Sequence, residues 1–446
     1  MVNRIVIAAP ASGHGKTTVA TGLLAAFARR GLRVAPFKVG PDYIDPGYHA
    51  LAAGRPGRNL DPVMVGEDLV GPLFAHGSRG ADLAVVEGVM GLYDGRTGAG
   101  EQGSTAQVAG LLDAPVIMVV DAAAQGRSIA ALVHGFRSFG AVRLAGVILN
   151  RVGSDRHERI LRDACEEVGT PVLGALRRAD AVAAPSRHLG LVPAAERRAE
   201  ALASVDAMAE LIAASVDLDA VAAVARSAAA LSFEAWDPAV AEPIENGPVV
   251  AVAGGPAFTF SYAETTELLS AAGATVLPFD PLHDERLPAG TRAIVVGGGF
   301  PEVYASALSA NEPLRDAVRK FDGVIAAECA GLLWLCESLD GAPMCGVLAA
   351  DAAMSPSLTL GYRDAVALSD SPLAPAGTRV TGHEFHRTTV HPRSGLLLSP
   401  AAGAAWAWRG ADPEGFATPR LHASYLHLHW AGRPGLAHNL VSAAAR

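Results

Sequence analysis

A glycine-rich segment near the N-terminus has the spacing of a phosphate-binding loop. Residues 9–18 read Ala-Pro-Ala-Ser-Gly-His-Gly-Lys-Thr-Thr, between an apolar run and an amphipathic stretch. In such a loop backbone N–H groups surround the phosphates, the lysine reaches the β and γ oxygens, and the following hydroxyl holds Mg²⁺. We therefore expect ATP here, with Mg²⁺ as its cofactor. The residues expected to bind it are Ser12, Gly13, Gly15, Lys16, Thr17 and Thr18.

Two departures within this loop bear on the class of protein. Pro10 stands where the usual motif has its first glycine. The alternative to a phosphate-binding loop is therefore a glycine-rich turn that packs against the protein and binds no ligand. Position 11 is Ala, whereas partition-type P-loop ATPases carry a second lysine there. Ala11 therefore favours an enzyme over an ATP-driven switch.

Carboxylates follow two of the apolar runs. Residues 38–49 read Lys-Val-Gly-Pro-Asp-Tyr-Ile-Asp-Pro-Gly-Tyr-His, and residues 83–95 read Leu-Ala-Val-Val-Glu-Gly-Val-Met-Gly-Leu-Tyr-Asp-Gly. Because parallel strands of a doubly wound sheet end at one ligand crevice, Asp42, Asp45, Glu87 and Asp94 should lie near the γ-phosphate. Glu87 ends an apolar strand and is the expected Mg²⁺ ligand with Thr17, while Asp45 is expected to add a second carboxylate. For the three aspartates, turn formation is the alternative.

Two more polar residues end predicted strands. Asp121 follows the strand 115–120 and rivals Glu87 as the metal-binding acid. Asn150 follows residues 146–149, and its amide is suited to an adenine edge, although an ordinary turn asparagine is an equal alternative.

A cysteine in the second half has the context of a nucleophile. Residues 324–335 read Val-Ile-Ala-Ala-Glu-Cys-Ala-Gly-Leu-Leu-Trp-Leu, so a strand ends at Glu328 and a helix begins after Cys329. Helix N–H groups beside such a thiol lower its pKa, and the N–H of Ala330 can donate to an oxyanion. The turn at residues 297–302 can supply the second donor, from Gly298 or Gly299.

Histidines near the C-terminus are the candidate bases for this thiol. Residues 423–430 read Ala-Ser-Tyr-Leu-His-Leu-His-Trp, and a histidine ending a strand near the elbow would accept the thiol proton. Four other histidines compete: His383, His386, His391 and His422. The spacing of His383 and His386 is a poor chelate, so a metal site there is not favoured.

Composition excludes several classes of protein. The chain has 446 residues, with 45 acidic and 36 basic side chains and a net charge of −9, which argues against nucleic acid as a partner. No apolar run reaches the length of a membrane span, and the run at residues 5–9 is too short for a signal peptide, so we expect a cytoplasmic protein without a membrane partner. Four cysteines without a C-x-x-C pair argue against structural zinc and disulfides.

The elements that position these residues alternate as in α/β proteins. Strands are predicted at 4–9, 33–37, 83–87, 115–120, 144–149 and 171–175, with helices at 16–30, 104–112, 126–139 and 155–168. We expect a doubly wound parallel sheet over residues 1–195, a helical segment and linker over 196–246, and a second α/β domain over 247–446. The second domain should have strands at 249–252, 275–279, 293–297, 324–328 and 346–348, then short strands and turns from 357 onward.

These motifs together resemble the cobyrinate or hydrogenobyrinate a,c-diamide synthases of cobalamin biosynthesis. The matching stretches are those at residues 8–18, 38–46 and 85–95, then Gly-Gly-Gly-Phe-Pro-Glu at 297–302 and Ser-Tyr-Leu-His-Leu-His-Trp at 424–430, so the resemblance spans the chain. It implies a dethiobiotin-synthetase-like P-loop domain followed by a class-I-like glutamine amidotransferase domain. Pro10 is usual in this family.

The resemblance also implies a reaction. Cys329 would release ammonia from glutamine, and MgATP would phosphorylate the a and c acetate groups of a corrinoid polycarboxylate, whose acyl phosphates then react with ammonia carried inside the protein. Asp42, Tyr43, Asp45 and Asp94 would face the acceptor carboxylate and acyl phosphate, and Lys38, Arg58 and Arg96 are candidates for holding the polycarboxylate. A homodimer is compatible with the family.

One departure leaves the base of Cys329 open. The wider class-I motif is Phe-His-x-Glu, whereas residues 426–429 read Leu-His-Leu-His. His427 therefore aligns with the base and His429 with the acid, and either histidine is a candidate. Alternative functions are a cobyric acid synthase, a nickel-sirohydrochlorin a,c-diamide synthase, or a P-loop switch with an inert amidotransferase-like module.

Overall fold

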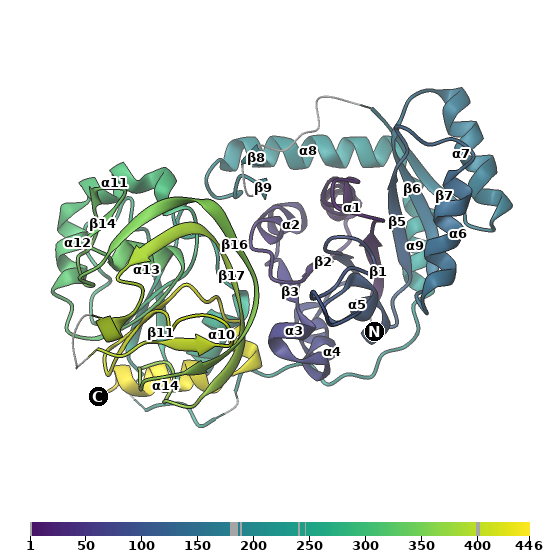
Figure 1. Cartoon of the computed structure of the whole chain (residues 1–446). Coiled ribbons are helices and arrows are strands. Elements are labelled where there is room, and N and C mark those ends of the chain that lie inside the picture. Colours follow the sequence, from purple (N-terminus) through teal and green to yellow (C-terminus); the bar gives the residue numbers. More distant parts are fainter. Residues whose placement is uncertain (1, 179–185, 188–189, 240, 246, 398–401) are drawn as a thin grey trace. The chain divides into compact units, whose positions relative to one another are not determined.

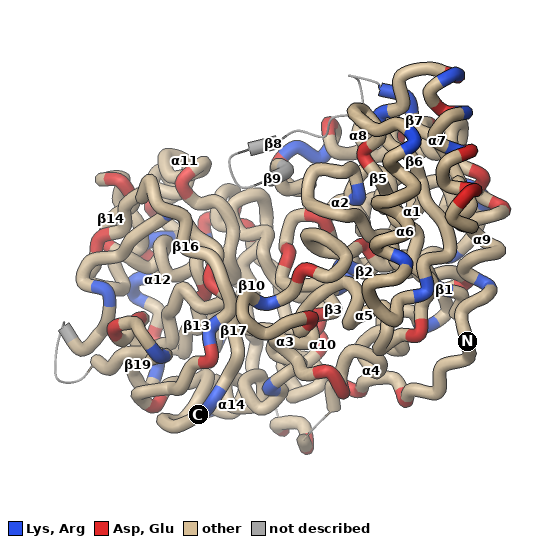
Figure 2. Tube along the Cα trace, turned by 45° about the vertical axis from the view of Figure 1, so that its right-hand side comes forward, with Lys and Arg blue, Asp and Glu red and all other residues tan. Residues whose placement is uncertain are grey.

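The computed structural model describes residues 2–178, 186–187, 190–239, 241–245, 247–397 and 402–446 (Figure 1). The chain divides into two compact units, Met1–Trp236 and Asp237–Arg446. Basic and acidic residues are interspersed along both units (Figure 2). Within the described part of the chain, no helix is both long and apolar enough to cross a membrane.

The first unit is built on a seven-stranded sheet with the order β3-β2-β4-β1-β5-β6-β7. Every pairing in this sheet is parallel. The strands are β1 (Asn3–Ala8), β2 (Val34–Val39), β3 (Arg58–Leu60), β4 (Leu83–Glu87), β5 (Val116–Asp121), β6 (Leu144–Val152) and β7 (Val172–Arg177). Residues 5–8 of β1 are completely buried, as expected of a parallel strand covered on both faces. All six predicted strands of this half are confirmed, and β3 is an addition.

Helices cover this sheet. They are α1 (Lys16–Arg29), α2 (Asp45–Ala53), α3 (Pro62–Val65), α4 (Glu67–Gly77), α5 (Thr105–Leu111), α6 (Ile129–Phe139), α7 (Asp155–Glu167), α8 (Arg198–Ser215) and α9 (Leu218–Arg226). A short pair, β8 (Ser186–Arg187) and β9 (Gly190–Leu191), lies between β7 and α8 in the chain. The predicted helical segment after residue 196 contains α8, which packs along α1 (Figure 1). Their approach is close at Gly22, where a Cβ atom would lie 2.4 Å from Cγ1 of Ile212.

The second unit has a six-stranded sheet with the order β11-β10-β12-β13-β20-β19, parallel except for the last pair. Its strands are β10 (Val249–Ala253), β11 (Thr275–Phe279), β12 (Thr291–Val296), β13 (Val324–Glu328), β20 (Leu421–Ser424) and β19 (Phe416–Thr418). The helices are α10 (Ala263–Ala271), α11 (Ala305–Ala310), α12 (Glu312–Arg319), α13 (Ala330–Leu335) and α14 (Gly435–Ala444), with 3₁₀ turns η2 (Pro301–Tyr304), η3 (Gly395–Leu397) and η4 (Trp430–Gly432).

Two predictions for this unit are wrong. Residues 346–348 form no strand, because the N–H groups of Cys345 and Val347 bond the carbonyls of Trp334 and Leu335 at the end of α13 instead of a neighbouring strand. The region after 357 contains long strands, β16 (Asp351–Ala367) and β17 (Arg379–His391), which pair in a second sheet with β14 (Ser338–Leu339), β15 (Ala342–Pro343) and β18 (Trp406–Trp408). A register shift between Met354 and Thr359 accommodates Pro356, which in the sequence indicates a break.

Candidate active sites

The phosphate-binding loop joins β1 to α1 at the carboxyl edge of the first sheet. Gly13 and Gly15 have φ of 82° and 97°, a left-handed conformation that glycine adopts without strain. A Cβ atom at Gly15 would lie 2.3 Å from Nδ2 of Asn150, so the loop packs directly on that side chain. The same Nδ2 donates to the carbonyl of His14 at 2.9 Å. The amide of Asn150 thus supports the loop, and its Oδ1 accepts from the N–H of Arg151.

The ammonium group of Lys16 is held by backbone carbonyls. It donates to the carbonyl of Ala11 at 3.1 Å and to that of Met90. Burial and the nearby charge of Lys38 lower its pKa to about 8. A nucleotide phosphate in this loop would take the place of these carbonyl contacts, because a phosphate oxygen carries full charge and the carbonyls do not.

Thr17, Asp45 and Glu87 come together as the sequence predicts. Oγ1 of Thr17 donates to Oε1 of Glu87 at 2.6 Å and lies 3.4 Å from Oδ2 of Asp45. The ammonium group of Lys38 sits among them, 2.6 Å from Asp45 and 2.9 Å from Glu87. These hard oxygen donors already surround one positive charge, and hydroxyl and carboxylate oxygens are the ligands that Mg²⁺ takes in nucleotide sites. The residues present therefore fit Mg²⁺.

The electrostatics of this cluster follow from burial and close opposite charges. Burial opposes the charge of Lys38, but Asp45 and Glu87 outweigh it and raise the pKa of the amine. Burial and the charge of Asp42 raise the pKa of Asp45 to about 7. Burial also opposes the charge of Glu87, yet Lys38 and His49 hold its pKa well below the usual range. Glu87 is therefore the more acidic of the two carboxyls.

Lys38 does not meet one expectation from the sequence. Its side chain is buried and bonded to both carboxylates, so it is not exposed to a polycarboxylate substrate. Its charge instead compensates the carboxylates where the metal would sit. Arg58 and Arg96 remain predictions for the substrate.

The remaining predicted acids of this half have local contacts. Oδ1 of Asp42 accepts from the N–H groups of Ile44 and Asp45 at the start of α2. Oδ2 of Asp94 accepts from the N–H of Gly91, and the Asp94 side chain is exposed. Asp121 pairs with Arg151 at 2.5 Å. It does not bond Thr17, so Glu87 is the better supported metal-binding acid.

In the second unit, Cys329 occupies a strained elbow between β13 and α13. Its φ of 49° and ψ of −102° are unusual for a residue with a side chain. The N–H of Ala330 bonds the thiol, and Sγ lies 3.9 Å from the carbonyl of Phe385 in β17. The side chain is buried, and burial together with Glu302 raises the pKa of the thiol. The expectation of a lowered pKa is therefore wrong for this conformation, because desolvation outweighs the helix N–H group.

His427 lies beside this elbow because β13 and β20 are neighbours. Glu328 pairs with Ser424 in the strand register, and the N–H of Cys329 donates to the carbonyl of Ser424 at 2.8 Å. His427 follows three residues later and is completely buried. Burial lowers its pKa to about 3, so the imidazole is neutral in this conformation and is a weaker base than an exposed histidine.

His429 points to a different part of the second unit. Its ring stacks on Tyr262, with centroids 4.2 Å apart, and Nε2 lies 3.8 Å from Oε2 of Glu264 in α10. Among the competing bases, His422 contacts Oγ of Ser371 and His386 stacks on Tyr425. The geometry therefore favours His427 over His429 as the neighbour of the thiol.

The two predicted glycine donors for an oxyanion differ. The N–H of Gly298 already donates to the carbonyl of Phe260 at 3.1 Å, so in this conformation it offers no donor. Gly298 has a steric role instead, since a Cβ atom there would lie 2.5 Å from Cε1 of His427. Gly299 packs against the carbonyl of Ala257 and remains a prediction, together with Ala330.

Comparisons with known proteins also assign one domain to each half of the chain. Residues 5–192 match the CobQ/CobB/MinD/ParA nucleotide binding domain, and residues 249–435 match the CobB/CobQ-like glutamine amidotransferase domain. Hydrogenobyrinate a,c-diamide synthase of Streptomyces coelicolor is 60% identical over 99% of this chain and 97% of its own length. The enzyme of the same name from Mycobacterium tuberculosis is 54% identical, over 100% of this chain and 98% of its own. Cobyrinate a,c-diamide synthase of a Synechococcus species is 41% identical, with 98% of each chain covered.

The chain belongs to the a,c-diamide synthase family. It is a ligase with a nucleotide-binding domain and a glutamine amidotransferase domain. Both α/β domains predicted from the sequence are confirmed.

Sequence reasoning missed two functional candidates in this member of the a,c-diamide synthase family. His49 is completely buried, and its Nε2 lies 2.7 Å from Oε2 of Glu87. Its distance of four residues from Asp45 would have placed both on one face of a helix, had α2 been predicted. Glu328 is the second, and its position directly before Cys329 gave no signal of its own.

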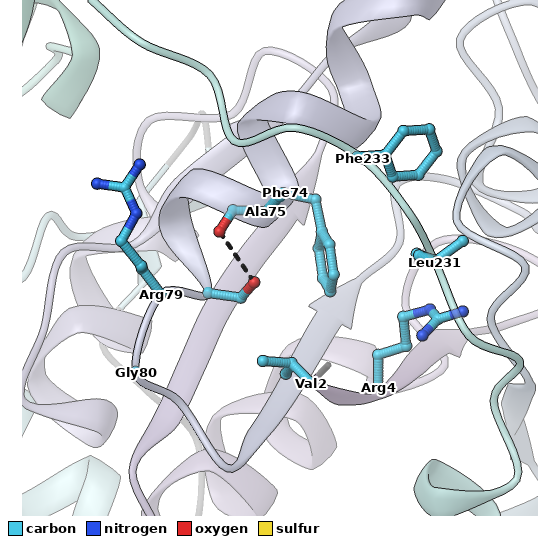
Figure 3. A pocket seen from close by; sticks show the side chains of 9 residues that line it. Val2, Arg4, Phe74, Ala75, Arg79, Gly80, Leu231 and Phe233 are labelled. Carbon is cyan, nitrogen blue, oxygen red and sulfur yellow. Dashed lines mark hydrogen bonds between the residues drawn. The ribbon is translucent and has the colours of Figure 1, made fainter.

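The described part of the first unit also contains a cavity of about 310 Å³ that is remote from this chemistry (Figure 3). Val2 and Arg4 line it at the beginning of β1, with Phe74 and Phe233. The phosphate-binding loop follows the other end of β1, so this cavity is not the synthetase site of the family. The guanidinium group of Arg4 is occupied by the carbonyls of Leu112, Asp113 and Ala229.

Proposed function

We propose that this protein converts the a and c acetate groups of hydrogenobyrinate into carboxamides, using ATP and glutamine. The observation that carries the proposal is the cluster of Thr17, Asp45 and Glu87 at a P-loop, in a chain that matches hydrogenobyrinate a,c-diamide synthases over nearly its full length. The relatives named for hydrogenobyrinate are 54–60% identical, whereas those named for cobyrinate are 41–44% identical. This difference supports the cobalt-free macrocycle as the substrate.

The first half-reaction activates the acceptor. A carboxylate oxygen of the substrate attacks the γ-phosphorus of ATP, the bond to the β-phosphate oxygen breaks, and an acyl phosphate and ADP form. Lys16 stabilises the charge on the β and γ oxygens after it leaves the carbonyls of Ala11 and Met90. Bound through Thr17, Asp45 and Glu87, Mg²⁺ would neutralise charge on the same phosphates. Tyr43, Asp42 and Asp94 are the proposed neighbours of the acceptor.

The second half-reaction supplies the nitrogen. The thiol proton of Cys329 passes to His427, and Sγ attacks the side-chain carbonyl of glutamine while the N–H of Ala330 donates to the oxyanion. The C–N bond breaks, ammonia leaves with the proton, and water hydrolyses the thioester to glutamate. Ammonia then attacks the acyl phosphate, and phosphate leaves. The buried, protonated thiol of this structure implies that glutamine binding must first displace the contact with Phe385.

Isotope transfer tests the acyl phosphate. Hydrogenobyrinate labelled with oxygen-18 in its carboxylates is incubated with MgATP and glutamine, and the inorganic phosphate is analysed by mass. We expect one labelled oxygen in the phosphate for each amide formed. Amide formation without label in the phosphate would contradict this mechanism.

The source of nitrogen is tested with Cys329→Ala. The variant should lose glutamine-dependent amidation but keep amidation with ammonium chloride, because its ATP site is unchanged. Cys336→Ala is the matched control, since Cys336 is also buried and its Sγ donates to the carbonyl of Leu332, four residues earlier in the chain. Loss of the ammonia-dependent reaction in Cys329→Ala alone would show that the thiol is needed outside glutamine hydrolysis.

A further inference from the structure

The activating histidine of this amidotransferase domain lies near a carboxylate that the family motif does not supply. The wider class-I pattern places a glutamate two residues after the histidine, and this chain has His429 there. In the structure Nδ1 of His427 lies 3.9 Å from Oε2 of Glu328, the residue directly before the nucleophile. Glu328 ends β13, and His427 lies three residues after the end of the neighbouring parallel strand β20, so the order of the strands brings the two side chains together.

Glu328 is fixed by the same segment that carries the histidine. Its Oε1 accepts from Nε1 of Trp430 at 3.2 Å, and the N–H of Leu428 also donates to the carboxylate. Both donors follow His427 within three residues, so the segment that carries the imidazole also holds the carboxylate. The Glu328 side chain is 17% exposed and His427 is 0% exposed, which shields their interaction from water.

We infer that Glu328 takes the place of the missing acid and is the positioning residue for His427. This inference rests on the proposed function, in which His427 accepts the proton of Cys329. When the imidazole becomes an imidazolium, its Nδ1–H needs an anionic acceptor, and Oε2 of Glu328 lies 3.9 Å from that nitrogen. The separation of 3.9 Å is longer than a hydrogen bond, and we expect it to shorten when glutamine binds.

His429 and Glu264 form the competing pair. Their polar atoms are 3.8 Å apart, much as in the first pair, but His429 is stacked on Tyr262 and Glu264 belongs to α10. Neither residue is adjacent to Cys329 in the chain or in the strand register. The two pairs therefore differ in their relation to the thiol, and substitution can separate them.

The test compares Glu328→Gln with Glu264→Gln as its matched control. Glutamine is isosteric and still accepts from Trp430, but it provides no negative charge. We expect Glu328→Gln to lower kcat of glutamine hydrolysis by at least about tenfold, with little change in KM for glutamine. Glu264→Gln should stay within about twofold of the parent. Ammonia-dependent amidation should persist in both variants, which shows that the first unit is intact, and a thermal unfolding curve like the parent's shows that the second unit folds.

Two further measurements keep the inference open to refutation. In a His427→Ala background, Glu328→Gln should cost no additional activity, because a residue that acts through His427 has nothing left to position. Glu328→Asp keeps the charge and should retain more activity than Glu328→Gln. If Glu328→Gln does not fold, Glu328→Asp is compared with the parent, and it should lose less than about tenfold in kcat.

Three results would overturn the inference. They are unchanged hydrolysis in Glu328→Gln, an equal loss with and without His427, and a loss confined to Glu264→Gln, which would assign the role to the His429–Glu264 pair. Failure of the proposed function has a different signature, because either the parent would not hydrolyse glutamine or Cys329→Ala would still hydrolyse it.

Discussion

Nε2 of His49 lies 2.7 Å from Oε2 of Glu87, and both side chains are buried. This contact leaves the other oxygen, Oε1, to Thr17 and Lys38. Oε2 of Glu87 is therefore held in place by His49, whereas Oε1 faces the position of the cation. A hydrogen bond such as the one from His49 fixes the orientation of a metal ligand before the metal binds.

The anchoring role predicts the effect of His49→Ala. Without the imidazole, Glu87 loses its fixed orientation, and the Mg²⁺ concentration needed for half-maximal ATP binding should rise by about 10- to 100-fold. Calorimetric titration of ATP at several Mg²⁺ concentrations measures this. His134→Ala, on the exposed surface of α6, should bind like the parent. Equal Mg²⁺ dependence in both variants would refute the anchoring role.

Lys38 should stabilise the first unit mainly by compensating two buried acids. Lys38→Met leaves Asp45 and Glu87 without their close cation, which should cost about 3–5 kcal/mol. Added Mg²⁺ should recover part of the lost Tm in the variant, because it supplies positive charge to the same oxygens.

The exposed pair of Arg33 and Asp82 offers a control for Lys38. Arg33→Met removes an ion pair on the surface and should cost no more than about 1 kcal/mol. Thermal unfolding of both variants, with and without Mg²⁺, gives the comparison. If Lys38→Met unfolds at the temperature of Arg33→Met, the buried ion pairs do not hold this site together.

Gly298 should be indispensable for glutamine hydrolysis for a steric reason. A methyl group at this position would lie 2.5 Å from Cε1 of His427, so Gly298→Ala must displace the imidazole from the elbow. We expect glutamine hydrolysis to fall by at least about tenfold while ammonia-dependent amidation persists. Gly435→Ala is the matched control, because outside its own helix backbone and its chain neighbours no atom lies within 4 Å of its Cβ position. Parent-like hydrolysis by Gly298→Ala would place the base elsewhere.

Glu414 should make the second unit less stable as the pH rises. It is buried, and burial raises its pKa from 4.5 to about 7, although Ser424 and the N–H of Tyr425 donate to it. A carboxyl with a higher pKa in the folded state stabilises fully below its unfolded pKa, and this contribution is lost as the pH rises towards 7.

Substitution isolates this group from the others that titrate. Glu414→Gln cannot ionise, so its stability relative to the parent should increase between about pH 5 and pH 8, by at most about 3 kcal/mol. Thermal unfolding at both pH values measures the change, with the exposed Glu337→Gln as control. A parent-like pH dependence in Glu414→Gln would show that this carboxyl does not titrate in that range.

The sequence was sufficient for the parallel strands and for the convergence of Thr17, Asp45 and Glu87. Apolar runs of strand length mark buried parallel strands, and the ends of such strands meet at one edge, so the metal cluster follows from topology. The sequence did not predict the contacts that depend on the direction in which a side chain points. Lys38 appeared available to a substrate because the sequence does not indicate whether a lysine turns into a cluster of acids.

The amidotransferase site shows the same limit. The strand, the elbow and the following helix around Cys329 are read directly from the sequence, and all three are present. The pairing of His427 with Glu328 depends on which strand lies next to β13, and 92 residues separate Glu328 from β20. Because β17 covers the thiol, its pKa is raised, and that cover comes from a long strand where only short ones were predicted.

Product analysis with purified protein tests the central claim most directly. The protein is supplied with MgATP and with glutamine labelled with nitrogen-15 in its amide. Hydrogenobyrinate, cobyrinate and a nickel sirohydrochlorin are tested as substrates in parallel reactions. The products are separated by chromatography and identified by mass spectrometry. We predict a hydrogenobyrinate product that carries two labelled amides, with two ATP hydrolysed for each molecule. Consumption of ATP and glutamine without an amide on any macrocycle would contradict the assigned substrate, and amidation of cobyrinate in preference to hydrogenobyrinate would contradict the assignment of the cobalt-free ring.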